Sequence, residues 1–171
     1  MSKRNHYFRC MKYAIVILWL VPLFASAQNC KVKTTKDPYT REVKVSTGLV
    51  LLTSGQYSIE ATKAQIDIMF SIEGKCFDDA STAAVFFEGT KLRTNFKNAG
   101  PMNCQGLFHL TFRNTNPAPS SLQNLGSKKI SSVKFKDNTA KETTITLNAD
   151  QQETLMQLIN CMIDAGKKLS Q

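Results

Sequence analysis

The residue types that could perform chemistry are few in this sequence. His109 is the only histidine outside the first 27 residues, and the cysteines outside that stretch are Cys30, Cys76, Cys104 and Cys161. His109 is the candidate for a general base, but such a base needs a nucleophile and an orienting acid close by. No Gly-x-Ser-x-Gly turn is present to supply the nucleophile. The sequence therefore identifies no catalytic residue, and it favours a protein that is not an enzyme.

The same residues argue against a metal site. No two cysteines have the C-x-x-C spacing typical of structural zinc, and a single histidine adds little. The adjacent acids Asp78 and Asp79 lack the alternating ligands and glycine bend of a calcium loop, so we interpret them as turn residues. Asp67 is interpreted as a solvated acid on a strand. We expect no metal and no cofactor.

Four cysteines in an exported chain predict two disulfides, because exported proteins fold in oxidising compartments. Three pairings are open, and the sequence does not choose among them. We prefer Cys76–Cys104 with Cys30–Cys161. The first bridge would close the middle hairpins, and the second would tie the start of the domain to the last helix.

Lysines form one dense group. Lys128, Lys129, Lys134 and Lys136 fall within nine residues, and we take them with His109 as a candidate binding surface. Such a run is usually a solvated face that protects a strand edge, and an acidic ligand is the alternative. No aromatic residues alternate with these lysines as they do in proteins that stack on bases, so we expect no nucleic acid.

The first 27 residues predict a secretory signal peptide. A basic segment is followed by an apolar stretch over residues 13–24 and by the small residues Ala25 and Ala27, which predict cleavage before Gln28. The apolar stretch is shorter than the roughly 20 residues that cross a bilayer. We therefore expect an exported protein, periplasmic or secreted, with no membrane span after cleavage and with one domain over residues 28–171.

Cleavage also changes the charge of the chain. Four of the 22 basic residues lie in the signal, which leaves 18 basic against 13 acidic residues and a net charge of +5 in place of +9. The basic character is therefore partly a property of the signal.

Strands must position these residues. Residues 65–76 alternate strictly, with Ile66, Ile68 and Phe70 on one face, which predicts a strand with one buried side. Residues 105–113 alternate in the same way and place His109 opposite the phenylalanines. Similar patterns predict strands over residues 41–53, with a bend at Gly48, and over residues 83–88, 91–96, 129–136 and 143–147. Ile130 does not fit this alternation, which indicates a bulge or a later start of the strand.

The last segment changes to a helical period. Asn148 or Asp150 can cap a helix, and apolar residues then recur at helical spacing. The predicted fold is mainly β with one C-terminal α-helix (α+β). Its antiparallel sheet would form a sandwich or a partly open barrel covered by the helix.

This outline resembles the small exported proteins of unknown function that are common in Bacteroidetes-type bacteria. The resemblance is carried by the Ala-Ser-Ala signal end, the turn at residues 36–40, the Asn-Cys-Gln-Gly stretch at 103–106 and Cys161 in the last helix. It implies no known activity.

Three functions remain open. The first is a non-enzymatic binding module of the periplasm or cell surface, with an unknown protein or small ligand as its partner. The second is a lipocalin-like carrier of an apolar ligand, and the third is a small hydrolase using His109. The sequence does not indicate the oligomeric state.

Overall fold

The structure is a computed structural model that describes residues 30–171. The predicted signal peptide and its cleavage residues Ala25, Ala27 and Gln28 lie outside this range. The elements, in chain order, are β1 (Lys33–Lys36), β2 (Val43–Ser46), β3 (Val50–Leu52), β4 (Gly55–Ala61), β5 (Gln65–Ser71), β6 (Thr82–Phe87), β7 (Arg93–Lys97), β8 (Leu107–Arg113), α2 (Ser120–Ser127), β9 (Ile130–Lys136), β10 (Glu142–Thr146) and α3 (Ala149–Ser170).

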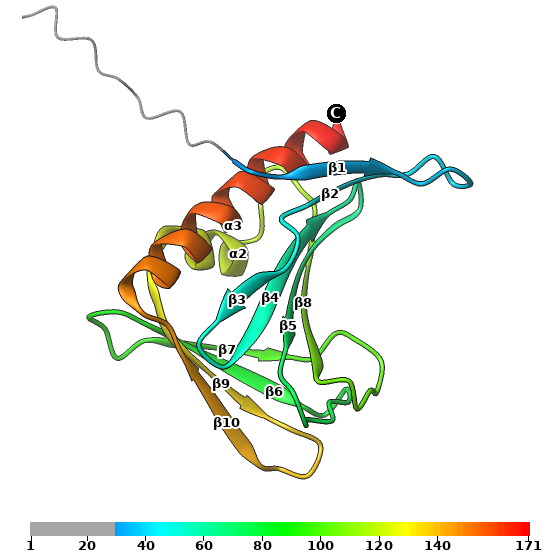
Figure 1. Ribbon diagram of the computed structural model, residues 1–171. Coiled ribbons are helices and arrows are strands. Elements are labelled where there is room, and N and C mark those ends of the chain that lie inside the picture. Colours follow the sequence, from blue (N-terminus) through cyan, green and yellow to red (C-terminus); the bar gives the residue numbers. More distant parts are fainter. Residues whose placement is uncertain (1–29) are drawn as a thin grey trace, which may run out of the picture.

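The strands form two antiparallel sheets. The six-stranded sheet has the order β1-β2-β4-β5-β8, and β3 pairs with β4 on the same edge as β2. The four-stranded sheet has the order β10-β9-β6-β7. Both sheets and the two helices surround the core (Figure 1). The predicted class, mainly β with a C-terminal helix, is confirmed, and the sheets do not close into a barrel.

β5 lies near the middle of the six-stranded sheet, between β4 and β8. Its predicted alternation is confirmed, because Ile66, Ile68 and Phe70 are each no more than 2% exposed. The strand ends at Ser71, earlier than expected, and Gly74 then turns the chain with a φ of +71°. A residue with a Cβ rarely adopts that backbone conformation.

The core is closely filled. Residues from both sheets and both helices converge on an enclosed space of only about 10 Å³, lined by Ile68, Phe70, Val85, Leu110, Leu125, Ile130, Val133, Leu155 and Ile159. Next to it, Phe135 makes edge contacts with Phe70 and Phe108, with ring centroids 5.3 and 5.2 Å apart. Edge-to-face packing is the arrangement that aromatic rings prefer.

Two local predictions of geometry are also confirmed. Asn148 caps α3 through a capping box with Gln151, in which each side chain bonds the other residue's backbone. The register between β6 and β9 shifts between Phe86 and Phe87, which is the irregularity that Ile130 indicated.

The structure pairs Cys30 with Cys161 and Cys76 with Cys104, as preferred from the sequence. Two disulfides indicate an oxidising, extracytoplasmic location. Among the described residues, no helix is long and apolar enough to cross a membrane.

Candidate functional site

Two neighbouring strands bring polar side chains together on the outer face of the six-stranded sheet. Apolar residues of β5 and β8 point into the core, so the residues between them point outward. The antiparallel register sets Asp67 opposite Thr111 and Met69 opposite His109. Asp67, His109 and Thr111 thus become neighbours, and we call them the His109 cluster.

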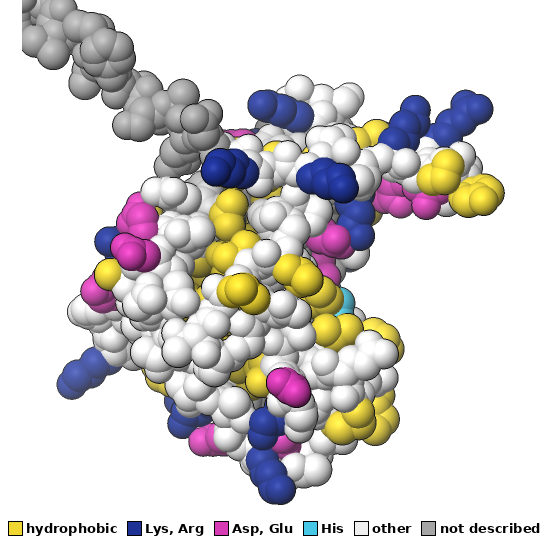
Figure 2. Space-filling model, viewed as in Figure 1, with side chains coloured by type: hydrophobic (Ala, Val, Ile, Leu, Met, Phe, Trp, Pro, Cys, Tyr) yellow, Lys and Arg dark blue, Asp and Glu magenta, His cyan; other side chains and the backbone are white. Residues whose placement is uncertain are grey.

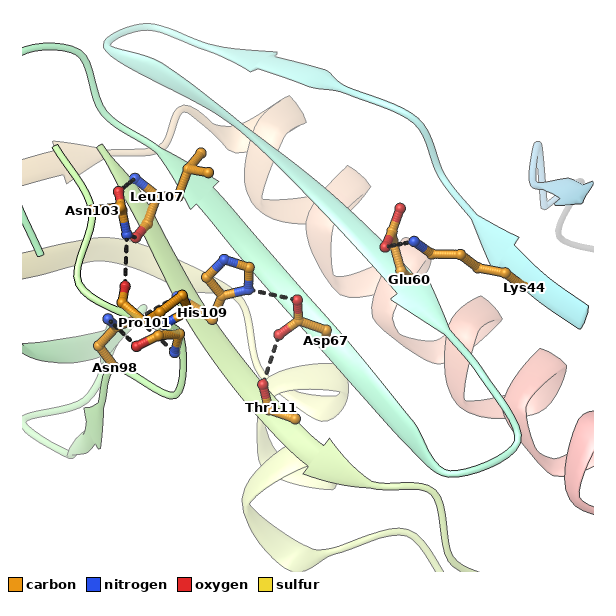
Figure 3. A network of polar contacts seen from close by, with 10 residues as sticks. Lys44, Glu60, Asp67, Asn98, Pro101, Asn103, Leu107, His109 and Thr111 are labelled. Atoms are coloured by element: carbon orange, nitrogen blue, oxygen red, sulfur yellow. Dashed lines mark hydrogen bonds and ion pairs between the residues drawn. The ribbon is translucent and has the colours of Figure 1, made fainter. Parts of the chain in front are cut away.

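The carboxylate of Asp67 accepts two hydrogen bonds within the His109 cluster (Figure 3). Its Oδ2 lies 2.8 Å from Nδ1 of His109, and Thr111 Oγ1 donates to its Oδ1 at 2.8 Å. The side chains of His109 and Asp67 are 23% and 17% exposed. Asp67 is therefore not the solvated acid that the sequence indicated, and it fixes the orientation of the imidazole.

Two asparagines cover the free edge of β8 beside the cluster. Asn98 Oδ1 accepts from the backbone N–H of His109 at 2.8 Å, and Ala99 donates to the carbonyl of His109 at 3.0 Å. The side chain of Asn103 makes both bonds to Leu107, accepting from its N–H and donating to its carbonyl, both at 2.9 Å (Figure 3). The outward peptide groups at the start of β8 are therefore satisfied.

Gly100 allows this loop to lie against the imidazole. A Cβ at residue 100 would come within 2.5 Å of Cδ2 of His109. Contacts that short do not occur between real Cβ atoms and carbon neighbours, so a larger residue would displace the ring.

The hydrogen bond that Asp67 accepts from His109 raises the pKa of His109 above its ordinary value of 6.5. Burial opposes this shift, and the negative charges of Asp67 and Glu60 add to it. Glu60 is itself in an ion pair with Lys44 (Figure 3). The cluster therefore favours the protonated imidazole.

The geometry differs from that of a hydrolytic triad. In a triad, the acid and the nucleophilic hydroxyl bind opposite nitrogens of the imidazole. Here the hydroxyl of Thr111 donates to Asp67, so the acid holds both groups and Thr111 is not activated. The cluster can present an oriented imidazole to a bound group, but it brings no nucleophile to His109.

The four candidate lysines lie elsewhere. Lys134 pairs with Glu142 at 3.1 Å, Lys129 pairs with Glu153 at 3.2 Å, and the Lys128 amine lies 5.6 Å from the centroid of the Phe87 ring. Lys136 is exposed at the end of β9. His109 belongs to the other sheet, so the structure does not unite it with the lysines in one surface. Local partners hold three of the four, as in an ordinary solvated face.

An apolar surface around β3 was not recognised from the sequence. Leu49 and Leu51 are 61% and 75% exposed, and Figure 2 shows hydrophobic side chains gathered over β3 and the adjoining part of α3. A groove of about 480 Å³ lies between the two elements, lined by Thr47, Val50, Thr154, Gln157, Leu158, the residues Cys30 and Lys31, and Cys161. We call Leu49, Leu51 and this groove the β3 surface.

The signal for this surface was present but ambiguous. Residues 49–52 are a continuous apolar run, which is typical of a strand buried on both faces. β3 instead lies at an edge of the sheet, and the sequence does not distinguish these two positions.

Within residues 30–171, no three His, Cys, Asp or Glu side chains converge in a way that could hold a metal ion. The chain matches no protein-family model, no curated protein and no solved structure. Its function must therefore be inferred from its own surfaces.

Proposed function

We propose that this protein is an exported, non-enzymatic binding module, periplasmic or secreted, that binds another protein through the β3 surface. The observation that carries the proposal is the exposure of Leu51 in the uncharged edge strand β3 and of Leu49 just before it. Exposed apolar side chains beside an open groove are typical of interaction sites.

The other edge strands support this choice by contrast. β1 carries Lys33 and Lys36, β7 carries Arg93 and Lys97, and β10 carries Glu142. Charged residues on an edge prevent association with other strands. Among residues 45–59, which include β3 and most of β4, there is no charged side chain. This edge therefore lacks the protection that the others have.

The two alternatives have less support. Pockets that hold small ligands are typically about 300–1,000 Å³, whereas the enclosed space among the core residues is about 10 Å³. A lipocalin-like carrier would need a cavity there. A hydrolase would need a nucleophile at His109, and the nearest hydroxyl in the cluster is bound to Asp67 instead.

Site-specific photo-crosslinking tests the proposal. A benzophenone amino acid would replace Leu51 in the full precursor, expressed in the cells that normally export it. The matched control carries the same group at Leu92, which is 60% exposed and lies between β6 and β7 of the four-stranded sheet. Both positions offer an exposed leucine of similar accessibility.

We expect one discrete protein adduct from position 51 and none from position 92. Equal adducts at both positions would indicate non-specific contact, and no adduct at position 51 would contradict the β3 surface as a binding site.

A further inference from the structure

We propose that the partner contributes an extended segment with apolar side chains that adds to the free edge of β3 as a further strand, in the groove between β3 and α3. This inference rests on the proposed function and specifies how the partner binds. It follows from three features of the β3 surface: its backbone, the volume of its groove and its chemistry.

The backbone of Leu51 points away from β4. Thr47 donates its N–H to the carbonyl of Ile59, and Ile59 donates its N–H to Oγ1 of Thr47, so the peptide groups of Ile59 face the β2–β3 side. Along a strand, the N–H and C=O groups of successive residues point to alternate sides. Tyr57 lies two residues before Ile59, so its groups also face the β2–β3 side and bond to Val50, its register partner. The N–H and C=O of Leu51 must therefore point outward.

These outward groups are not covered as those of β8 are. Among the described residues, no loop or side chain forms a hydrogen bond with the backbone of Leu51 outside the strand ladder. An added strand forms its hydrogen bonds with residues whose N–H and C=O both point outward from the edge. Leu51 therefore offers one donor and one acceptor to such a strand.

The groove, of about 480 Å³, suits a single segment. An added strand would lie about 4.8 Å from β3, with Thr154, Gln157 and Leu158 of α3 on its far side. The edge of a folded sheet would bring its own next strand another 4.8 Å outward, toward α3. A second copy of this domain is therefore a poor fit, and its charge of +5 would add repulsion.

The chemistry of the walls describes the segment. Side chains of an added strand alternate between its two faces. One set would meet Val50 and Leu158 in the groove, and the other would lie beside the exposed Leu51. Val50, Leu158 and Leu51 are apolar, whereas Lys31, Thr154 and Gln157 make the rest of the groove polar. The segment should therefore carry β-branched or aromatic residues at the positions that face Val50, Leu158 and Leu51.

The test separates the backbone of Leu51 from its side chain. The crosslinking group is placed at Leu49, and Leu51 is changed either to Ala, which keeps the N–H, or to Pro, which removes it. Because the N–H of Leu51 faces away from β4, Leu51→Pro leaves the β3–β4 ladder intact. We expect Leu51→Ala to lower the adduct because it removes part of the apolar contact, and Leu51→Pro to reduce it at least tenfold further.

If Leu51→Pro fails to fold, an amide-to-ester replacement at residue 51 removes the same N–H and keeps the leucine side chain. Equal adducts from the Ala and Pro variants would overturn strand addition and leave the proposed function standing. Equal loss from both would do the same, because the side chain would then carry the binding. An adduct of twice the mass of this chain would show that a second copy of this chain, and not a separate partner, binds the β3 surface. No adduct from the unsubstituted Leu51 protein would contradict the proposed function itself.

Discussion

The six-stranded sheet ends at β8 on one side and at β1 and β3 on the other, and the edges of β8 and β3 differ. At β8, the amides of Asn98 and Asn103 bond the outward peptide groups of His109 and Leu107. At β3, the outward groups of Leu51 have no such cover, and the leucine itself is 75% exposed. The protein's own chain therefore covers the edge of β8 and leaves that of β3 available.

The two edges differ in what their residues contribute. A hydrogen bond within the protein is worth about 1 kcal/mol net to folding, so the contacts around His109 stabilise the domain. An exposed leucine contributes little to folding, but its burial is worth about 1.5–3 kcal/mol. That free energy is still available to a partner at Leu49 and Leu51.

Each edge also has its own disulfide. Cys30–Cys161 joins the start of the domain to α3 beside the groove, and Cys76–Cys104 anchors the loop that precedes β8. Replacing both Cys30 and Cys161 by Ala should cost about 4–5 kcal/mol of unfolding free energy, because the bridge closes a loop of 131 residues. Urea denaturation measures this cost.

The matched control is alanine at both Cys76 and Cys104, where the loop is only 28 residues and the expected cost is about 3–4 kcal/mol. Loss of Cys30–Cys161 should lower crosslinking from Leu49 and leave the pKa of His109 unchanged. If loss of Cys30–Cys161 shifted the pKa of His109 and loss of Cys76–Cys104 did not, the two edges would not be independent.

Asp67→Asn should remove the charge that holds His109 and Thr111. We expect a loss of about 1–2 kcal/mol at pH 6, because hydrogen bonds to charged groups are stronger than neutral ones and solvent partly screens this pair. The pKa of His109 should fall toward 6.5, because the largest cause of its upward shift is removed. NMR titration follows it directly, because His109 is the only histidine of residues 28–171.

Glu60→Gln is the control for Asp67→Asn. It breaks the Lys44–Glu60 pair, whose side chains are 44% and 35% exposed, and removes only the smallest of the contributions that raise the pKa of His109. Stability should therefore change by less than about 0.5 kcal/mol. An equal effect of the two variants would mean that nearby negative charge in general, and not the hydrogen bond to Asp67, holds the imidazole.

The contribution of His109 to the free energy of unfolding should fall as the pH rises. Its pKa is higher in the folded state than the ordinary 6.5, so the folded state binds the proton more tightly. The contribution is fully present below pH 6.5 and is lost as the pH rises through the folded pKa. We expect less than about 1 kcal/mol, because the pair is partly solvated.

Comparison of unfolding curves between pH 5 and pH 8 for the native protein and for His109→Asn measures this contribution. The difference between the two proteins should shrink as the pH rises. A difference that grew with pH would contradict the direction of the shift.

Leu51→Lys should have the smallest effect on folding and a large effect on binding. An exposed substitution usually changes stability by less than about 0.5 kcal/mol, and Leu51 is 75% exposed. The added charge should abolish the adduct from Leu49, because charged residues protect strand edges. Thermal unfolding and crosslinking of the same preparation measure both, and a loss of several kcal/mol would show that Leu51 is structural.

The sequence by itself determined those features that depend on near neighbours along the chain. Alternation placed Ile66, Ile68 and Phe70 inward because side chains change face at every residue of a strand. The pair Asn148 and Gln151 determined the start of α3 because a capping box spans only four residues. The mainly β fold class followed from such local patterns.

The tertiary structure decided which strands are neighbours. Asp67 and His109 are 42 residues apart, and only the pairing of β5 with β8 joins them. The apolar run at residues 49–52 suited a buried strand equally well, and only the sheet order placed it at an edge. Pairing depends on the total burial of the whole sheet, and a local pattern is compatible with several such pairings. Both the His109 cluster and the β3 surface arise at this level.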